Sequence, residues 1–159
     1  MTAVPDVLPA SIELDDLPGH HIRRLHQIAV AIFLQETEPL GLTPVQYAAL
    51  QAVANAPGID QRTLARTIGL DTSTTGGVVD RLEARGLLLR SANPDDRRVR
   101  LLALTEAGHA LLREAVPAML RAQQRILAPL PAPERDEFLR MLRTVVVANN
   151  ALSRAPSEA

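Results

Sequence analysis

Apolar residues recur at intervals of three and four positions along much of this 159-residue chain. That spacing predicts amphipathic helices, each with one apolar face. One such helix is expected over about residues 18–38, with Asp16 as its N-terminal cap and with Pro39 and Gly41 ending it. The apolar positions of this helix are Ile22, Leu25, Ala29, Ile32 and Phe33.

Two more amphipathic helices are expected near the C-terminus, over about residues 105–128 and 134–152. Thr105 is a suitable cap for the first of them, and Pro117 is expected to bend it because proline removes one backbone hydrogen bond. The stiff segment Pro129–Pro133 separates the two helices. The positions expected to form their seams are Leu112, Val116, Met119, Gln123 and Ile126 in the first and Phe138, Met141, Leu142, Val145 and Leu152 in the second.

Between these helices the pattern changes to short helices followed by two strand-like segments. Thr43 to Gln46 form a capping box that opens a helix with Val45, Ala48, Ala49, Ala52 and Val53 inward. Asp60 is expected to cap a helix ending near Ile68, and a second short helix covers about residues 72–85 with Thr75, Val78, Val79 and Leu82 inward. Leu87–Ser91 and Arg98–Leu104 are expected strands, joined by turn-forming residues. This order is typical of a winged helix-turn-helix.

The charge distribution adds a modest basic patch. The net charge is −1, but residues 60–100 hold eight arginines against six acids, and the rest of the chain holds nine against twelve. A local basic region in a near-neutral chain is compatible with binding duplex DNA. Cysteine is absent, which excludes disulfides and thiolate metal sites. No apolar run long enough to cross a membrane and no export signal are recognised, so a cytoplasmic protein without a membrane partner is expected.

Several segments resemble the MarR/SlyA family of bacterial transcription regulators. The resemblance rests on LTPVQYAALQAV, on the helix pair around LARTIGLDTST, on VVDRLEARGLL and above all on NPDDRRVRLLALTEAG, and it covers about residues 18–150. It implies a homodimer whose first, fifth and sixth helices interlock. It further implies a recognition helix in each major groove of DNA and wing tips in the flanking minor grooves.

The expected fold is therefore mainly α with a small β-hairpin wing, a winged helix-turn-helix with N- and C-terminal dimerisation helices. Its parts are a flexible arm (residues 1–15), a dimerisation helix (16–41), a DNA-binding lobe (42–105), two further dimerisation helices (106–152) and a disordered tail (153–159). Three apolar helices exceed what a small winged-helix core can bury, so an obligate interface is expected to cover the surplus.

The helix over residues 72–85 is the expected recognition helix. The residues expected to contact DNA are Thr72, Ser73, Thr74, Gly76, Gly77 and Arg81. Short hydroxyls and free N–H groups at a helix start can reach base edges or phosphates, and Arg81 can anchor a phosphate. The alternative is that the hydroxyls only cap the helix. Gly76-Gly77 departs from the family pattern: either the backbone approaches DNA closely there, or direct base reading is weak and DNA shape matters more.

The expected wing tip carries Asp96, Arg97 and Arg98. Arg98 matches the family position that enters the minor groove, where narrow A·T-rich stretches concentrate negative potential. Asp96 matches the acid that holds that arginine in place. A solvated charged turn is the alternative interpretation.

A small aromatic carboxylate is the expected effector by resemblance. His20 and Arg24 lie on one helix face and are proposed as its polar partners, with Tyr47 as a ring wall. Neither a metal nor a cofactor is expected, because the histidines lack the spacing of a metal site; they are His20, His21, His26 and His109. No catalytic motif is present, so the chain is not expected to be an enzyme.

The sequence thus predicts a DNA-binding repressor that a small aromatic acid, of hydroxybenzoate or hydroxynicotinate type, releases from a pseudo-palindromic operator. Two alternatives stay open. One is a winged helix that binds protein, and the other is a MarR-type regulator of efflux or surface polysaccharide without an aromatic ligand.

Overall fold

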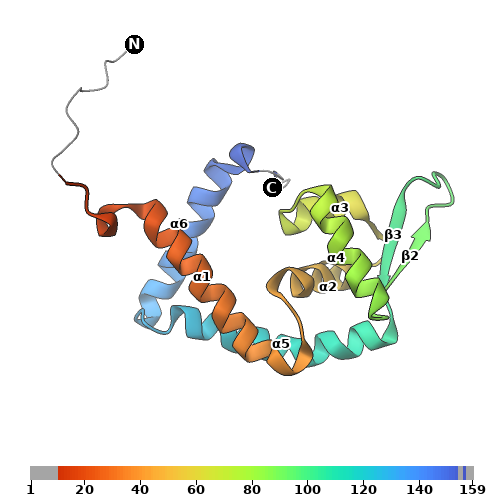
Figure 1. Cartoon of the computed structure of the whole chain (residues 1–159), viewed down its shortest axis with the longest axis horizontal. Coiled ribbons are helices and arrows are strands. Elements are labelled where there is room, and N and C mark those ends of the chain that lie inside the picture. The colour runs from red at the N-terminus through yellow and green to blue at the C-terminus, as the bar shows by residue number, and fades with distance from the viewer. Residues whose placement is uncertain (1–10, 154–155, 157–159) are drawn as a thin grey trace, which may run out of the picture.

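The computed structural model describes residues 11–153 and 156, and it is mainly helical with one small antiparallel sheet (Figure 1). This confirms the expected fold class. Most of the expected arm (residues 1–10) and most of the expected tail (154–155 and 157–159) lie outside the described residues. The elements are α1 (Pro18–Thr37), α2 (Pro44–Asn55), β1 (Ile59–Asp60), α3 (Gln61–Ile68), α4 (Thr72–Ala84), β2 (Leu88–Ala92), β3 (Arg100–Leu104), α5 (Glu106–Leu127) and α6 (Ala132–Ala148).

Side-chain caps begin most of the helices as expected. The Thr43 hydroxyl accepts from the N–H of Gln46 at 3.2 Å, and the Gln46 side chain accepts from the N–H of Thr43 at 3.1 Å, so the capping box of α2 is complete. Asp60 caps α3 and Thr105 caps α5. The prediction for Asp16 is wrong: it lies in a 3₁₀ turn (Leu14–Asp16), and Leu17 precedes α1 without a side-chain cap. Pro18 opens α1 instead, in a position where no amide hydrogen bond is lost.

The sheet has the order β1-β3-β2, and β2 and β3 form the wing (Figure 1). The two-residue strand β1, which pairs Ile59 with Leu102, was not expected from the sequence. The strand β3 begins at Arg100 and not at Arg98, because the N–H of Arg98 donates to Asp96 Oδ1 and the N–H of Val99 donates to the Asp96 carbonyl. Those bonds hold Arg98 in the turn of the wing.

The core of the lobe joins α2, α3, α4 and the sheet. The inward residues predicted for α4 are all buried. In α2 the core extends further than expected, because Tyr47 and Leu50 are buried along with Ala49 and Val53. This helix contacts α3, α4, α5 and β3, so more than one of its faces is covered. Leu50, Leu64, Val79, Leu82, Leu88 and Leu102 are the large apolar side chains at its centre.

The helix α5 crosses under the lobe and then runs along α1 (Figure 1). It continues through Pro117. Its most buried face differs from the expected seam: Leu112 is buried as expected, Val116 and Met119 are only partly buried, and Gln123 is exposed. The residues buried beside Leu112 are the small ones, Ala115, Ala118 and Ala122. Small side chains allow two helices to approach closely, which sequence periodicity alone does not reveal.

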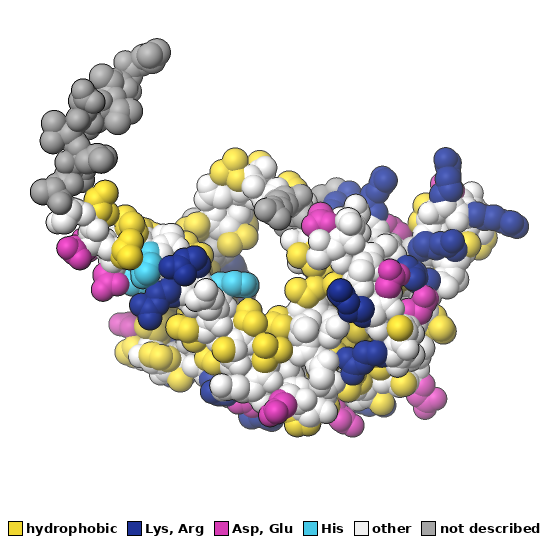
Figure 2. Space-filling view, in the orientation of Figure 1, with side chains coloured by type: hydrophobic (Ala, Val, Ile, Leu, Met, Phe, Trp, Pro, Cys, Tyr) yellow, Lys and Arg dark blue, Asp and Glu magenta, His cyan; other side chains and the backbone are white. Residues whose placement is uncertain are grey.

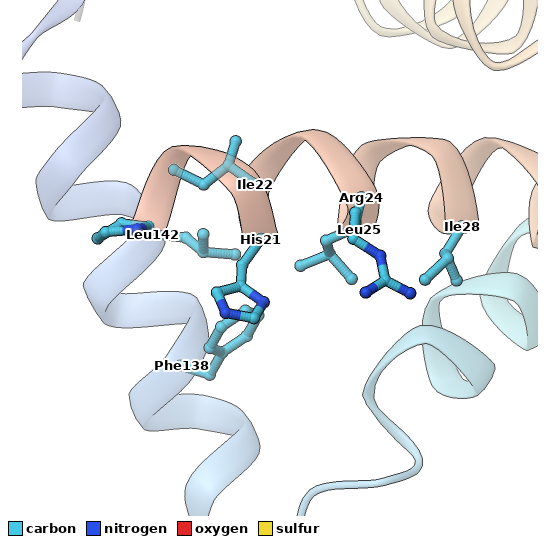
Figure 3. A pocket seen from close by; sticks show the side chains of 8 residues that line it. His21, Ile22, Arg24, Leu25, Ile28, Phe138 and Leu142 are labelled. Carbon is cyan, nitrogen blue, oxygen red and sulfur yellow. The ribbon is translucent and has the colours of Figure 1, made fainter. Parts of the chain in front are cut away.

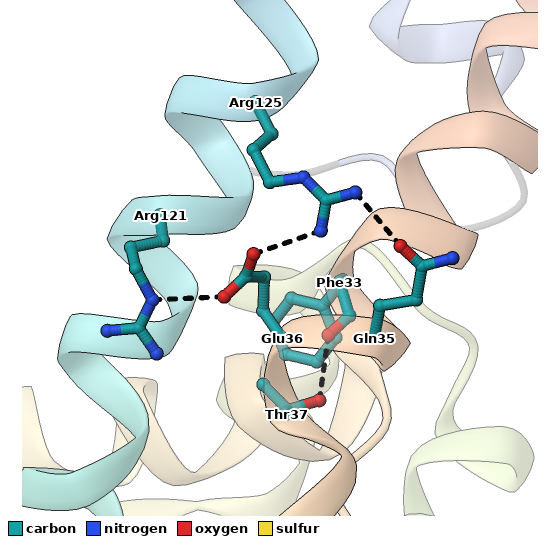
Figure 4. Close-up of polar contacts among 6 residues, drawn as sticks. All are labelled: Phe33, Gln35, Glu36, Thr37, Arg121 and Arg125. Carbon is teal, nitrogen blue, oxygen red and sulfur yellow. Dashed lines mark hydrogen bonds and ion pairs between the residues drawn. The ribbon is translucent and has the colours of Figure 1, made fainter.

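A charged junction fixes α1 against α5 (Figure 4). Glu36 Oε2 accepts from Arg121 Nε at 3.0 Å, and Glu36 Oε1 accepts from Arg125 Nη1 at 2.9 Å. Arg125 also donates to the side chain of Gln35 at 2.9 Å. Hydrogen bonds from these two arginines hold the pKa of Glu36 below its ordinary value. The junction therefore stays charged at neutral pH and ties the end of α1 to α5.

The helix α6 contains no buried residue. Its exposed large apolar side chains are Leu139, Met141, Leu142, Val145, Val146 and Val147. It begins at Ala132, two residues before the expected start. Nowhere in the described part of the chain is a helix both long and apolar enough to span a membrane.

Candidate nucleic-acid interface

The start of α4 presents small hydroxyl side chains to the outside. Asp71 caps the helix: its Oδ1 accepts from the N–H of Thr74 at 2.7 Å and its Oδ2 accepts from the Thr74 hydroxyl at 2.8 Å. These bonds lower the pKa of the Asp71 carboxyl. Thr72 and Ser73 are exposed, and no hydrogen bond from their hydroxyls is found to a described residue. The capping role falls to Asp71 with Thr74, which leaves Thr72 and Ser73 available to a ligand.

The two glycines of α4 have different surroundings. A Cβ at Gly76 would lie 3.4 Å from the side-chain nitrogen of Gln61 on α3, whereas a Cβ at Gly77 would meet only Arg81 Nη1, at 4.0 Å. Neither glycine has a positive φ angle. Gly76 therefore belongs to the contact between α3 and α4, while Gly77 is open to the outside beside Arg81.

We expect Gly77→Ala to raise the free energy of unfolding by about 0.5–1 kcal/mol, because alanine loses less backbone entropy in a helix and meets no steric obstacle here. Urea denaturation measures this. Gly76→Ala is the matched control, with a smaller gain because it touches Gln61. A loss of stability in Gly77→Ala would contradict the prediction. The operator affinity of Gly77→Ala distinguishes the two interpretations of the glycines. If the DNA backbone approaches α4 closely, it would clash with the new methyl group and the affinity would fall.

Two arginines that the sequence analysis did not assign hold α4 in position. Arg90 on β2 contacts Asp80 at 2.6 Å and Glu83 at 2.9 Å, and its hydrogen bond lowers the pKa of Glu83. Arg85, which follows α4, donates to the carbonyls of Leu40 and Gly41 at 3.0 and 2.9 Å. The helix α4 is thus tied both to the wing and to the segment that follows α1. Local periodicity gives no sign of the Arg85 link, because its partners lie more than 40 residues away.

The wing tip exposes its arginines. Asp96 contacts Arg98 through Oδ1, which accepts from the Arg98 N–H at 3.0 Å and from Nε at 3.3 Å. The Arg98 side chain is nevertheless 93% exposed. Arg97 is exposed next to it, and Arg81 is exposed on α4. Figure 2 shows arginine side chains projecting from the wing at the right of the view.

The three residues expected around an effector are not brought together within one chain. Tyr47 lies in the core of the lobe, its ring 6.0 Å from that of Phe33 and its hydroxyl bonded to Gln51. Phe33 and His20 are thirteen residues apart on α1, which corresponds to about 20 Å at the rise of an α-helix. Arg24 does line a cavity of about 460 Å³ between α1 and α6, but the histidine that lines it is His21 rather than His20 (Figure 3). His20 instead contacts Arg23 at 3.3 Å.

Among the described residues, no group of three or more His, Cys, Asp and Glu side chains is placed to hold a metal ion.

Comparison with known proteins places the chain among transcription regulators. The model of the MarR family matches residues 42–99. The transcriptional repressor NicR of Pseudomonas putida is 34% identical over 87% of this chain and 92% of its own length. The solved structure of PcaV from Streptomyces coelicolor with its natural ligand is 38% identical, with a TM-score of 0.79 over 87% of this chain and 97% of that one.

A second solved structure is of a relative whose DNA binding is regulated by a ligand. That structure, of Bordetella bronchiseptica BpsR, concerns the regulation of its DNA binding by 6-hydroxynicotinic acid. It is 33% identical to this chain, with a TM-score of 0.81, and the match covers 86% of this chain and 97% of that one.

Proposed function

The chain belongs to the MarR family and is a transcriptional repressor of MarR type, and from this premise we propose that it binds a pseudo-palindromic operator as a homodimer and leaves it when a small aromatic carboxylate binds. The observation that carries the proposal is the joint exposure of the α4 start and the wing arginines, together with an apolar cavity between α1 and α6.

Homodimer formation is supported by the exposed apolar surface of α6. Val145 and Val146 are 55% and 63% exposed, and further apolar side chains surround them on the same helix. Monomeric proteins seldom leave so continuous an apolar surface in water. A second copy of the chain is the occupant that fits, because a two-fold axis presents two recognition helices to the two half-sites of a palindrome.

DNA binding is supported by the shape and charge of the lobe. The exposed start of α4 offers Thr72, Ser73 and free N–H groups to the major groove, with Arg81 further along the helix. Arg98 is almost fully exposed at the wing tip, from which it would enter a flanking minor groove. Gly76 and Gly77 leave the middle of α4 without side chains, so some of the specificity is proposed to come from DNA shape.

An aromatic effector is supported by the cavity between α1 and α6 (Figure 3). Its walls are mainly apolar, and Leu25, Ile28 and Phe138 suit an aromatic ring. Arg24 and His21 are the polar side chains on its rim, and an arginine can pair with a carboxylate through two hydrogen bonds. We therefore place the carboxylate at Arg24 and replace His20 with His21 as its neighbour.

The cavity is connected to the DNA-binding lobe through α1. The Glu36 junction fixes the end of α1 to α5, and Arg85 then links the segment after α1 to the recognition helix. A ligand changes the spacing of the two recognition helices only if it binds one spacing better than the other, with a coupling of about 1–3 kcal/mol in typical cases.

Titrating a preformed operator complex with benzoate, salicylate, hydroxybenzoates, hydroxycinnamates and hydroxynicotinates tests the effector. At least one acid is expected to weaken operator binding by roughly 5- to 150-fold. Arg24→Ala and His21→Ala should respond less while binding DNA normally, and His20→Ala, whose side chain lies outside the cavity, is the matched control. Failure of every acid at millimolar concentration would refute this class of effector, and an unchanged response in Arg24→Ala would refute the placement.

A further inference from the structure

A cleft of about 630 Å³ separates α3 from the wing. Charged residues from both sides line it, and these are Asp60, Arg62, Arg66, Asp96, Arg98 and Arg100. Arginines outnumber aspartates by four to two, so the cleft carries a formal charge of +2. It is separate from the α4 surface and from the cavity between α1 and α6.

Both aspartates of the cleft are already engaged within the protein. Asp60 Oδ1 accepts from the N–H of Thr63 at 2.8 Å, and Asp60 Oδ2 accepts from the Thr63 hydroxyl at 2.6 Å. Burial raises the pKa of Asp60, but these hydrogen bonds outweigh burial and leave the pKa below its ordinary value. Asp96 is bonded to the backbone and side chain of Arg98. The carboxylates thus shape the two rims of the cleft, as a helix cap and as a turn.

Arg62 and Arg100 are two of the exposed arginines of the cleft. Arg62 is exposed on the first turn of α3, and its guanidinium has no hydrogen bond or ion pair with a described residue. Arg100 is exposed at the start of β3 and also lines the cleft. Guanidinium groups bind phosphate oxygens through paired, charge-assisted hydrogen bonds. A phosphate between α3 and the wing would meet donors from two elements.

We propose that this cleft binds one phosphodiester of the operator backbone, with Arg62 from α3 and Arg100 from β3 as its donors. The proposal rests on the proposed DNA-binding function. If α4 occupies the major groove and the wing occupies the neighbouring minor groove, one sugar–phosphate strand must pass between them, because that strand is what separates the two grooves. The cleft lies between the wing and α3, which packs against α4, so that strand would pass beside it. Arg62 then sets the position of the protein on DNA without reading sequence.

The expected result for Arg62→Ala is a loss of roughly tenfold in affinity for the operator and a similar loss for an unrelated duplex. The slope of log affinity against log salt should become shallower by about 1, since one phosphate contact is lost. Arg62→Lys should restore much of the slope, because it keeps the charge. Arg113→Ala, which removes an exposed arginine from α5 outside the cleft, is the matched control and should leave affinity and slope unchanged.

Neutral methylphosphonate groups placed one at a time along the operator locate the contact. One position should weaken binding of the natural protein and have little effect on Arg62→Ala. The cleft does not bind phosphate if Arg62→Ala keeps the natural affinity and salt slope, or if no methylphosphonate position has an effect that depends on Arg62. In either case the DNA-binding function stands. If the natural protein itself fails to bind any duplex, the proposed function has failed first. A melting temperature equal to that of the natural protein confirms that Arg62→Ala is folded.

Discussion

Replacing Val145 and Val146 together with glutamate is expected to convert the dimer to monomers and to weaken operator binding by roughly 10²- to 10⁴-fold. Both side chains are largely exposed on α6 and would be buried against a second copy. Two charges in that interface would lose their hydration without gaining partners. The helix itself should not be weakened, because glutamate has a higher helix propensity than valine.

Analytical ultracentrifugation of the double variant measures the change in mass, and an operator titration measures the loss of affinity. The matched control is Arg113→Glu, which changes the net charge by the same −2 on an exposed position of α5 near the lobe, and it should remain dimeric. A double variant that stays dimeric would show that this part of α6 does not form the interface.

Replacing Arg98 with alanine is expected to weaken operator binding by roughly 10- to 100-fold while leaving the dimer and its melting temperature unchanged. The guanidinium is almost fully exposed, and its ion pair with Asp96 is on the surface, where such pairs contribute little to stability. In the minor groove, by contrast, the same charge would lie in a region of concentrated negative potential.

The control for Arg98→Ala is Arg97→Ala, which removes the same charge from the neighbouring position and should lose less affinity. When the flanking A·T pairs of the operator are replaced with G·C, the natural protein and Arg98→Ala should differ less in operator affinity, because the wider minor groove attracts arginine less strongly. Equal affinities of the natural protein and Arg98→Ala would remove the wing from DNA binding.

Features that depend on a few adjacent residues could be predicted from the sequence. The caps at Thr43, Asp60 and Thr105 and the inward face of α4 follow from side-chain chemistry and helical periodicity, and the structure contains them as expected. The failure at Asp16 also has a local cause, because the chain turns once before Pro18 opens the helix.

Features that depend on distant partners could not be predicted in this way. Ile59 belongs to a strand only because Leu102, more than 40 residues later, pairs with it. The alanine-rich face of α5 is recognisable only when α1 lies against it. For the same reason the sequence did not separate His21, which lines the cavity, from His20, which does not. Nor did it show that Tyr47 lies in the lobe core.

Whether the protein binds a two-fold symmetric operator as a dimer is tested by selecting binding sites from a pool of random DNA duplexes and then measuring the mass of the complex. We expect enriched sites with two half-sites related by two-fold symmetry, about 10 bp from centre to centre. Each site should be bound by one dimer, with an affinity that falls steeply as salt rises. No enrichment, or a single asymmetric half-site bound by a monomer, would contradict this expectation.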